Sequence, residues 1–283
     1  MRLFAISDLH LPFGADKTMD IFGPEWQNHA HRVAAAWKRV VRPEDVVLVP
    51  GDLSWGMRLT DAQPDLDFLG GLPGSIVLVR GNHDYWWQSL ARVRQALPPN
   101  VFALQNDFYP LPGGLAVCGT RGWTLPGEEE ADESRDCGVE NGAGGCGDRT
   151  GAGEDQAAQA QDRKIYAREL VRLELSLQAA VKAGRRPHFA MLHYPPTGAR
   201  GQETGFTQLL ERYRVKLCVY GHLHGKRRAG AVRGVVRGVE YRLVACDAVG
   251  FEPVLLWETG AADAGTSAPA DARSDTTADA ASS

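Results

Sequence analysis

Five short segments of the chain carry side chains of the types that bind metal ions, and each directly follows an apolar run. The metal-binding side chains among them are Asp8, His10, Asp52, Asn82, His193, His222 and His224. Four imidazoles, two carboxylates and one amide oxygen suit one or two divalent ions such as Mn2+, Fe2+ or Zn2+. Because seven donors exceed the needs of one four-coordinate ion, the set predicts two ions that share a bridging carboxylate.

The apolar runs before these segments are expected to be buried strands. They have the Val, Ile and Leu content and the short length of strands, and they lie at residues 3–7, 46–49, 75–79, 189–192 and 217–220. Further strands are expected at residues 115–119, 241–245 and 254–257. The ends of strands are where an α/β sheet exposes its ligand site, so we expect the polar segments to meet.

Helical patterns alternate with these runs and predict an α/β fold. The expected helices cover residues 25–41, 61–69, 88–97, 162–183 and 206–213. Thr60 is the expected N-cap of the second of these helices. His29 and His31, near the start of the first, are interpreted as ordinary helix residues rather than ligands.

Composition limits the class of protein. The chain has 283 residues, of which 43% are hydrophobic and 23% charged, enough for one large domain. A net charge of −4 gives no global basic field, which disfavours a long nucleic-acid footprint. No apolar run approaches the roughly 18 residues of a membrane span, and Asp8 falls too early for a signal peptide. These features predict a cytoplasmic protein without membrane contact, and they identify no protein partner.

Two stretches lack the pattern of a folded core. Residues 127–160, rich in Gly, Ala and Asp, are interpreted as a flexible insertion in a domain that covers residues 1–259. Residues 260–283 are interpreted as a disordered tail. The five cysteines form no C-x-x-C pair, and those in apolar runs, Cys118, Cys218 and Cys246, are expected to be core residues.

The ordered series D-x-H, G-D, G-N-H-D, H and G-H-x-H resembles the calcineurin-like metallophosphoesterase superfamily. The wider segments Gly-Asn-His-Asp-Tyr-Trp-Trp, Gly-Thr-Arg-Gly-Trp and His-Tyr-Pro-Pro are similar to a compact bacterial subgroup of predicted phosphohydrolases. The resemblance covers residues 1–257 apart from the insertion. It implies a four-layer α/β/β/α sandwich in which two mixed sheets are flanked by helices.

The resemblance also implies a role for each polar residue. The implied ligands are Asp8, His10 and His224 for one ion, Asn82, His193 and His222 for the other, and Asp52 as the bridge between them. His83 would contact the phosphate and assist the leaving group. Asp84 would orient and charge the His83 imidazole.

The expected activity is that of a dinuclear metal-dependent phosphoesterase, a phosphoric ester hydrolase. A hydroxide that bridges two ions about 3.5–4 Å apart would attack phosphorus in line, without a covalent intermediate. The favoured ion is Mn2+ and the favoured substrate is a nucleotide-type or other small phosphodiester, with a short nucleic acid as a further option. A phosphomonoesterase or pyrophosphohydrolase remains an alternative. A non-catalytic metal-bound scaffold is the alternative of a different class, although no implied ligand is missing.

Substrate contacts are less well defined by the sequence. Tyr85 and Trp86 adjoin the Asn82-His83 segment and are candidates to stack on a base or an aryl group. Arg121 and Arg200 are candidate phosphate contacts. The alternative for the aromatic residues is core packing beneath the loop, and the alternative for the arginines is a solvated surface role.

Overall fold

The computed structural model describes residues 1–15, 17, 19–127 and 152–260, without the side chains of residues 152–155. Its first strand, β1 (Arg2–Ala5), shows how the layers arise. Neighbouring side chains of a strand point to opposite faces. Leu3 and Ala5 therefore enter an apolar cluster between two sheets, whereas Phe4 enters a cluster under helices.

The first sheet combines parallel and antiparallel pairing. In spatial order it contains β11 (Val254–Glu258), β1, β2 (Val46–Pro50), β3 (Ser75–Val79) and β4 (Val101–Ala103). The strands β1 to β4 are parallel, and β11 runs antiparallel beside β1. The carboxyl ends of β1, β2 and β3 consequently share one edge.

The second sheet also combines parallel and antiparallel pairing, and it has antiparallel strands at both of its edges. Its order is β5 (Phe108–Pro110), β6 (Leu115–Thr120), β7 (Arg186–Leu192), β8 (Leu217–Tyr220), β10 (Val239–Leu243) and β9 (Gly234–Val236). The two sheets are joined just beyond β1. There Ser7 donates its N–H to the Val244 carbonyl at 2.8 Å and accepts the N–H of Cys246 at 3.0 Å.

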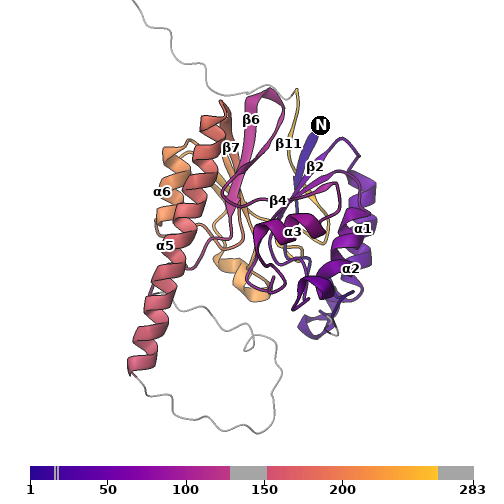
Figure 1. Ribbon diagram of the computed structural model, residues 1–283, viewed down its shortest axis with the longest axis horizontal. Coiled ribbons are helices and arrows are strands. Elements are labelled where there is room, and N and C mark those ends of the chain that lie inside the picture. The colour runs from indigo at the N-terminus through magenta and orange to yellow at the C-terminus, as the bar shows by residue number, and fades with distance from the viewer. Residues whose placement is uncertain (16, 18, 128–151, 261–283) are drawn as a thin grey trace, which may run out of the picture.

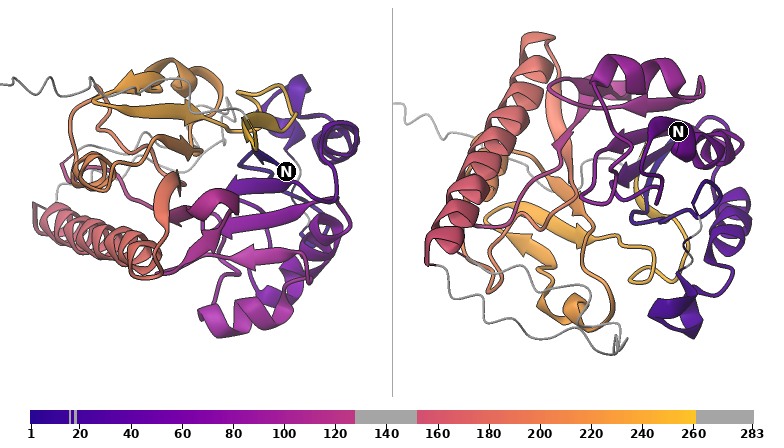
Figure 2. Two further views of the ribbon diagram at one scale, coloured as in Figure 1. Left: turned by 90° about the horizontal axis from the view of Figure 1, so that it is seen from above. Right: turned by 60° about the horizontal axis from the view of Figure 1, so that its bottom comes forward.

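Helices cover the outer face of each sheet, as Figures 1 and 2 show. Beside the first sheet lie α1 (His29–Val40), α2 (Leu59–Gly70) and α3 (Leu90–Ala96), and beside the second lie α5 (Ala152–Lys182) and α6 (Gly205–Arg212). Short 3-10 turns complete the described chain: η1 (Asp20–Phe22), η2 (Pro24–Trp26), η3 (Pro112–Gly114) and η4 (Gly225–Gly230).

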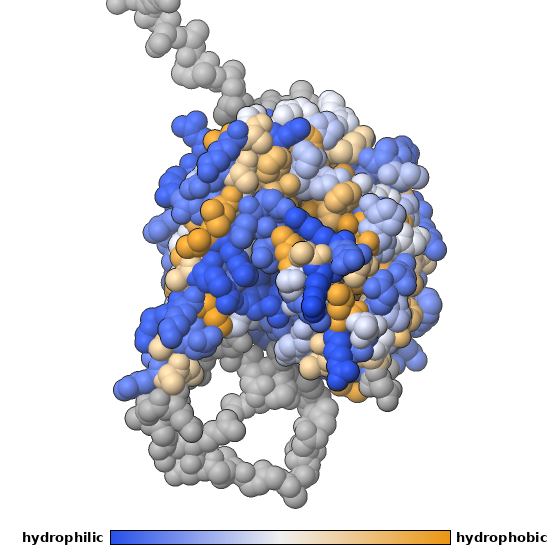
Figure 3. Space-filling view, in the orientation of Figure 1, coloured by the Kyte–Doolittle hydropathy of each residue, from blue (hydrophilic) through white to orange (hydrophobic). Residues whose placement is uncertain are grey.

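Three apolar layers hold the sandwich together. One lies between the sheets, one between the first sheet and α1 to α3, and one between the second sheet and α5 and α6. These layers confirm the predicted four-layer α/β/β/α sandwich of two mixed sheets. On the face drawn in Figure 3, hydrophobic residues lie in small groups among hydrophilic ones.

The longest helix begins earlier than the sequence predicted. Helix α5 starts at Ala152 rather than at residue 162, so the interpretation of residues 152–160 as part of a flexible insertion was wrong. This segment is rich in Ala and Gln, which favour helix even without an apolar stripe. The remaining predicted insertion (128–151, with Cys137 and Cys146) and tail (261–283) lie outside the described residues.

Other boundaries also differ from the prediction. Helix α1 begins at His29, after Asn28 takes a left-handed backbone with φ of 53°. Helix α2 is capped at Arg58 rather than at Thr60, because the Asp61 carboxylate accepts the Arg58 N–H at 3.0 Å. The short strands β4, β5 and β9 were not predicted, since three residues carry too little periodicity to be recognised.

The cysteine prediction is confirmed for the described residues. Cys118, Cys218 and Cys246 are buried and form no disulfide. A search of the same part of the chain for membrane spans gives a negative result, because none of its helices is both long and apolar enough.

Candidate metal centre

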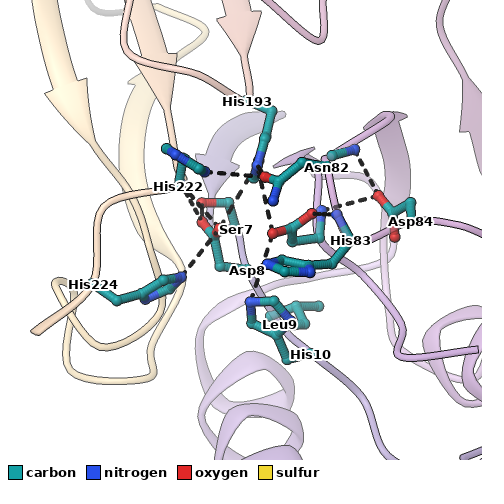
Figure 4. Close-up of polar contacts among 12 residues, drawn as sticks. Ser7, Asp8, Leu9, His10, Asn82, His83, Asp84, His193, His222 and His224 are labelled. Carbon is teal, nitrogen blue, oxygen red and sulfur yellow. Dashed lines mark hydrogen bonds and ion pairs between the residues drawn. The ribbon is translucent and has the colours of Figure 1, made fainter. Parts of the chain in front are cut away.

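The polar segments that follow five parallel strands meet at one edge of the sandwich. Asp8, Asp52 and Asn82 come after strands of the first sheet, and His193 and His222 come after strands of the second. Figure 4 shows the side chains of Asp8, Asn82, His193 and His222 pointing toward one another across the boundary between the sheets. The sheets thus bring together donors that are far apart in the sequence.

The first group of candidate ligands consists of Asp8, His10 and His224. Each offers one donor atom, and these atoms lie within 4.8 Å of one another. Nε2 of His224 is 3.3 Å from Oδ1 of Asp8. Asp8 and His10 are buried, and the His224 side chain is 24% exposed, so this group has one side open to solvent.

The second group consists of Asn82, His193 and His222. The amide oxygen of Asn82 lies 2.5 Å from Nε2 of His193 and 3.0 Å from Nδ1 of His222. Both histidines are buried. The other ring nitrogen of His193, Nδ1, is 3.0 Å from the carbonyl oxygen of Pro50, which fixes the orientation of the ring.

Asp52 lies between the two groups. Its Oδ2 atom is 3.5 Å from Nε2 of His193 and 3.7 Å from Nε2 of His10. Asp8, Asp52 and His193 also form a cluster of donor atoms within 4.8 Å of one another. A carboxylate with both groups in reach is geometrically able to serve both.

Several of these residues are held in a backbone conformation that side chains disfavour. The φ angles of Asp8, His10, Asp52 and His222 are 58°, 41°, 52° and 72°. Non-glycine residues adopt such angles rarely, and the strain persists only where the surrounding structure enforces it. Here it turns each side chain out of its strand and toward the centre.

Two glycines make room for the carboxylates. A Cβ atom at Gly81 would lie 2.0 Å from Oδ1 of Asp52, and one at Gly221 would lie 2.2 Å from Oδ2 of Asp8. Both distances are far below van der Waals contact. Any other residue at these positions would displace a candidate ligand.

The charges of the centre favour a cation. Burial would raise the pKa of Asp8, but His224 and His193 outweigh it and lower that pKa. Burial lowers the pKa of His224, whereas Asp8 and Asp247 outweigh it and raise the pKa to about 10. The negative charges of Asp8 and Asp247, which stabilise the proton on His224, would also stabilise a divalent cation beside them.

The remaining imidazoles favour the neutral form that binds metals. Burial, followed by repulsion from His224, lowers the pKa of His10 well below its usual value, and burial and His193 do the same for His222. Nδ1 of His10 is buried and has no hydrogen-bond partner among the described residues. Imidazole, carboxylate and amide donors fit divalent ions of the first transition row.

His83 lies at the rim of the first group. Its backbone N–H donates to Oδ1 of Asp52 at 2.8 Å. Its ring centroid is 5.6 Å from that of His10 and 4.8 Å from that of Trp55. The side chain is half-buried. The imidazole is therefore positioned beside the centre and within reach of solvent.

Asp84 has a different set of contacts from the one expected. Its carboxylate accepts the N–H groups of Gly81, Asp52 and Leu53 at 2.7, 3.0 and 2.9 Å, and the indole N–H of Trp86 at 2.9 Å. Within the described chain it forms no hydrogen bond to the His83 ring, so the expected orientation of that ring by Asp84 needs correction. Asp84 instead ties the loop of Asp52 to the loop of Asn82.

Asp247 was missed by the sequence analysis. Its Oδ1 is 2.9 Å from Nδ1 of His224, and its Oδ2 accepts the N–H of Gly225 at 3.0 Å. A carboxylate behind a ligand imidazole fixes the ring and makes it a stronger donor. The signal was present, because Asp247 follows the expected strand at residues 241–245 in the same way as the other polar segments follow theirs.

The four residues predicted to contact the substrate differ in exposure and in distance from the centre. Tyr85 is 52% exposed, but Trp86 is fully buried and cannot stack on a ligand, as the core alternative held. The Arg121 side chain is 11% exposed, with Nη2 3.8 Å from Oε1 of Glu169. Arg200 is exposed in the loop between β7 and α6, with no described contact to the centre.

Comparison with known proteins identifies the class. A sequence model of the family described as calcineurin-like phosphoesterase matches residues 1–226, which include all seven candidate ligands. The chain belongs to the calcineurin-like phosphoesterase family. A phosphohydrolase activity that uses divalent metal ions is supported by this membership and by the donor groups above.

Solved structures with a similar arrangement are distant in sequence. A protein of unknown function from Aquifex aeolicus is 14% identical, with 90% of this chain and 95% of that chain covered and a TM-score of 0.41. The phosphopantetheinyl hydrolase of Mycobacterium tuberculosis is 17% identical, with 86% and 88% covered and a TM-score of 0.42. No curated protein gave a significant match.

Proposed function

We propose that the protein hydrolyses phosphoesters with two divalent metal ions. Asp8, His10 and His224 would hold one ion, Asn82, His193 and His222 the other, and Asp52 would serve both. The observation that carries this proposal is the convergence of seven donors of suitable chemistry from five strand ends. When bound, the ions would supply an activated water and would neutralise negative charge on the phosphate.

The residues of the chain account for the remaining steps. His83 donates a proton to the departing oxygen, an effect typically worth about 10²–10⁴-fold in rate. Its position beside Asp52 but outside both ligand groups supports this role. Asp84 acts indirectly, because its contacts to Gly81, Asp52 and Leu53 keep the ligand loops in register.

The favoured substrate is a small phosphodiester of the nucleotide type, with Mn2+ as the favoured ion. Monoesters and pyrophosphates are the competing substrates. A cytoplasmic location is favoured by the free buried cysteines, since disulfides are rare in that compartment.

The test is turnover by the purified protein. The metal-free protein is reconstituted with Mn2+, Fe2+ or Zn2+ and supplied with matched diesters, monoesters and pyrophosphates. We expect metal-dependent release of phosphate or of the alcohol, with the highest rate on a diester. Protein that holds two ions and hydrolyses none of these substrates would instead support the non-catalytic scaffold.

A matched pair of histidine variants distinguishes the loss of a metal ligand from the general effect of removing a histidine. His193→Ala removes a candidate ligand, whereas His31→Ala removes an exposed histidine of α1. We expect His193→Ala to lose about one bound ion and nearly all turnover, and His31→Ala to retain both. Equal metal content in the two variants would exclude His193 from the ligand set.

A further inference from the structure

A cavity of about 250 Å3 adjoins the metal centre on the side of the first ligand group. It is bounded by the η1–η2 segment, by the loop after β2 and by the start of η4, and its wall includes Met19, Phe22, Trp26, Trp55, Lys226 and Arg227. His10 and His224 also line it. The cavity therefore opens directly onto two candidate ligands.

Aromatic contacts connect the wall of this cavity to His83, the proposed proton donor. The rings of Trp55 and His10 are stacked, with centroids 4.5 Å apart and planes inclined by 22°. The Trp55 centroid also lies 4.8 Å from that of His83. A group that leaves phosphorus with a proton from His83 would thus depart toward the Trp55 wall.

The wall has the composition of a pocket for a flat ring. Met19, Phe22 and Trp26 form an apolar surface, and a cavity below the roughly 300–1,000 Å3 of drug-sized pockets fits one ring system rather than a polymer.

Two cationic side chains belong to the lining of the cavity. Lys226 is exposed and Arg227 is half-buried, and both line the cavity. The ammonium group of Lys17 lies 3.3 Å from the centroid of the Trp55 ring, which adds a third cation nearby. Glu25 is the acidic residue of the lining, so cations prevail and an anionic ester is attracted.

We propose that this cavity binds the leaving group of the substrate and selects phosphoesters in which that group carries a planar aromatic ring. The assignment rests on the proposed function, because it takes the ester to be bound at the metal centre. The ring would lie against Phe22 and Trp26, with the phosphate beside His10 and His224. The size of the cavity limits the group bound inside it to about one ring system.

The test compares two esters that differ in shape but not in chemistry. Benzyl phosphate and ethyl phosphate, with their methyl diesters, all release alkoxides of similar basicity, so differences in rate report on the pocket. We expect kcat/KM to be at least ~10-fold higher for the benzyl esters. Equal values for benzyl and ethyl esters in an active enzyme would overturn the pocket assignment and leave the phosphoesterase activity standing.

Variants of the wall test the residues by name. Phe22→Ala removes part of the apolar surface, and we expect the benzyl-to-ethyl ratio to fall close to one. Phe22→Leu keeps an apolar side chain and should retain most of the preference. A ratio unchanged in Phe22→Ala would contradict the proposal.

The contribution of the cationic lining residues is tested separately. Lys226→Ala should raise KM for both esters without changing their ratio, whereas Lys182→Ala, on the exposed surface of α5, should change neither. A change in the ratio caused by Lys226→Ala would assign selection to charge rather than to ring shape.

Binding without turnover keeps the pocket and the activity distinguishable. Phenylphosphonate and methylphosphonate cannot be hydrolysed in the same way, and their affinities are measured by calorimetry with Mn2+ present. Tighter binding of phenylphosphonate in a protein without hydrolytic activity would support the pocket and overturn the proposed function. Equal affinities would overturn the pocket. Competition by adenosine monophosphate, compared with ribose 5-phosphate, then decides between a nucleobase and a simple aryl ring.

Discussion

The two groups of candidate ligands are held in place by different kinds of contact. In both groups the members contact one another, but the support from outside differs. In the first group a side chain gives it, since the Asp247 carboxylate meets Nδ1 of His224. In the second group the backbone gives it, since the Pro50 carbonyl oxygen meets Nδ1 of His193. The first group can therefore be weakened without touching a ligand, while the second is most readily altered through its own members.

The largest effect is expected where the groups meet. Asp52→Asn removes the negative charge that lies beside His10 and His193. We expect both metal affinities to fall and turnover to drop by more than ~100-fold. Elemental analysis and steady-state kinetics measure this, with Asp67→Asn on the exposed side of α2 as the control. An active Asp52→Asn protein that holds two ions tightly would show that the groups do not share this carboxylate.

The next largest effect concerns His83, which contacts Asp52 but belongs to neither group. His83→Ala should leave two ions bound and cost at least ~10²-fold in turnover on an unactivated diester. The loss should be clearly smaller on a nitrophenyl ester, whose leaving group needs little protonation. Equal losses on both esters would assign His83 to charge stabilisation, and loss of an ion would make it a ligand.

A smaller effect, confined to the first group, is expected from Asp247. Asp247→Asn weakens the acceptor behind His224, so the affinity for one ion should fall by about 10–100-fold while the other stays unchanged. Titration of the metal-free protein with Mn2+ resolves the two affinities. Asp107→Asn, which alters an exposed carboxylate paired with Arg94, is the matched control. A parallel fall at both sites would mean that the groups are not supported independently.

The smallest effect concerns the stability of the loop after Asp52. Asp65 accepts a hydrogen bond from Ser54, and burial raises the pKa of Asp65 to about 6 although this bond opposes the shift. Because the folded pKa lies above its ordinary value of 3.8, the protonated form stabilises the fold, and that contribution is lost as pH rises through about 6.

Asp65→Asn does not titrate at this position. The difference in Tm between variant and parent should therefore shift in favour of the variant by roughly 2 °C between pH 5 and pH 7.5. Thermal unfolding followed by circular dichroism at the two pH values measures the shift. A constant difference would show that the Asp65 carboxyl does not titrate in this range.

The pattern of strands and helices was sufficient for the α/β class and for the meeting of the polar segments, whereas the four layers followed from the family resemblance. Parallel strands place their carboxyl ends at one edge, so residues such as Asp8 and His193 could be assigned to one site without coordinates. Asp247 escaped because it follows a strand with a weaker pattern than the others. The sequence also could not show that Asp84 would accept hydrogen bonds from Asp52 and Leu53, since these residues belong to a separate loop.

The cavity could not be predicted for a similar reason. The η1–η2 segment has neither helical nor strand periodicity, and its conformation depends on contacts such as that between Trp26 and Phe251, whose ring centroids are 5.2 Å apart. Trp86 and Tyr85 are neighbours of the same chemical type, yet one is buried and the other exposed. Which of two adjacent aromatic residues faces solvent is set by the turn between them.

The pairing of β1 with β11 also bears on how the protein is made. Asp8 and His10 leave the ribosome long before their partners His224 and Asp247, and β1 lacks its outer neighbour until Glu258 has emerged. Because domains fold as units, a nascent chain carries isolated carboxylates and imidazoles rather than a chelating site. We therefore expect the site to bind metal only after Glu258 has joined the fold, and not while its ligands are still apart.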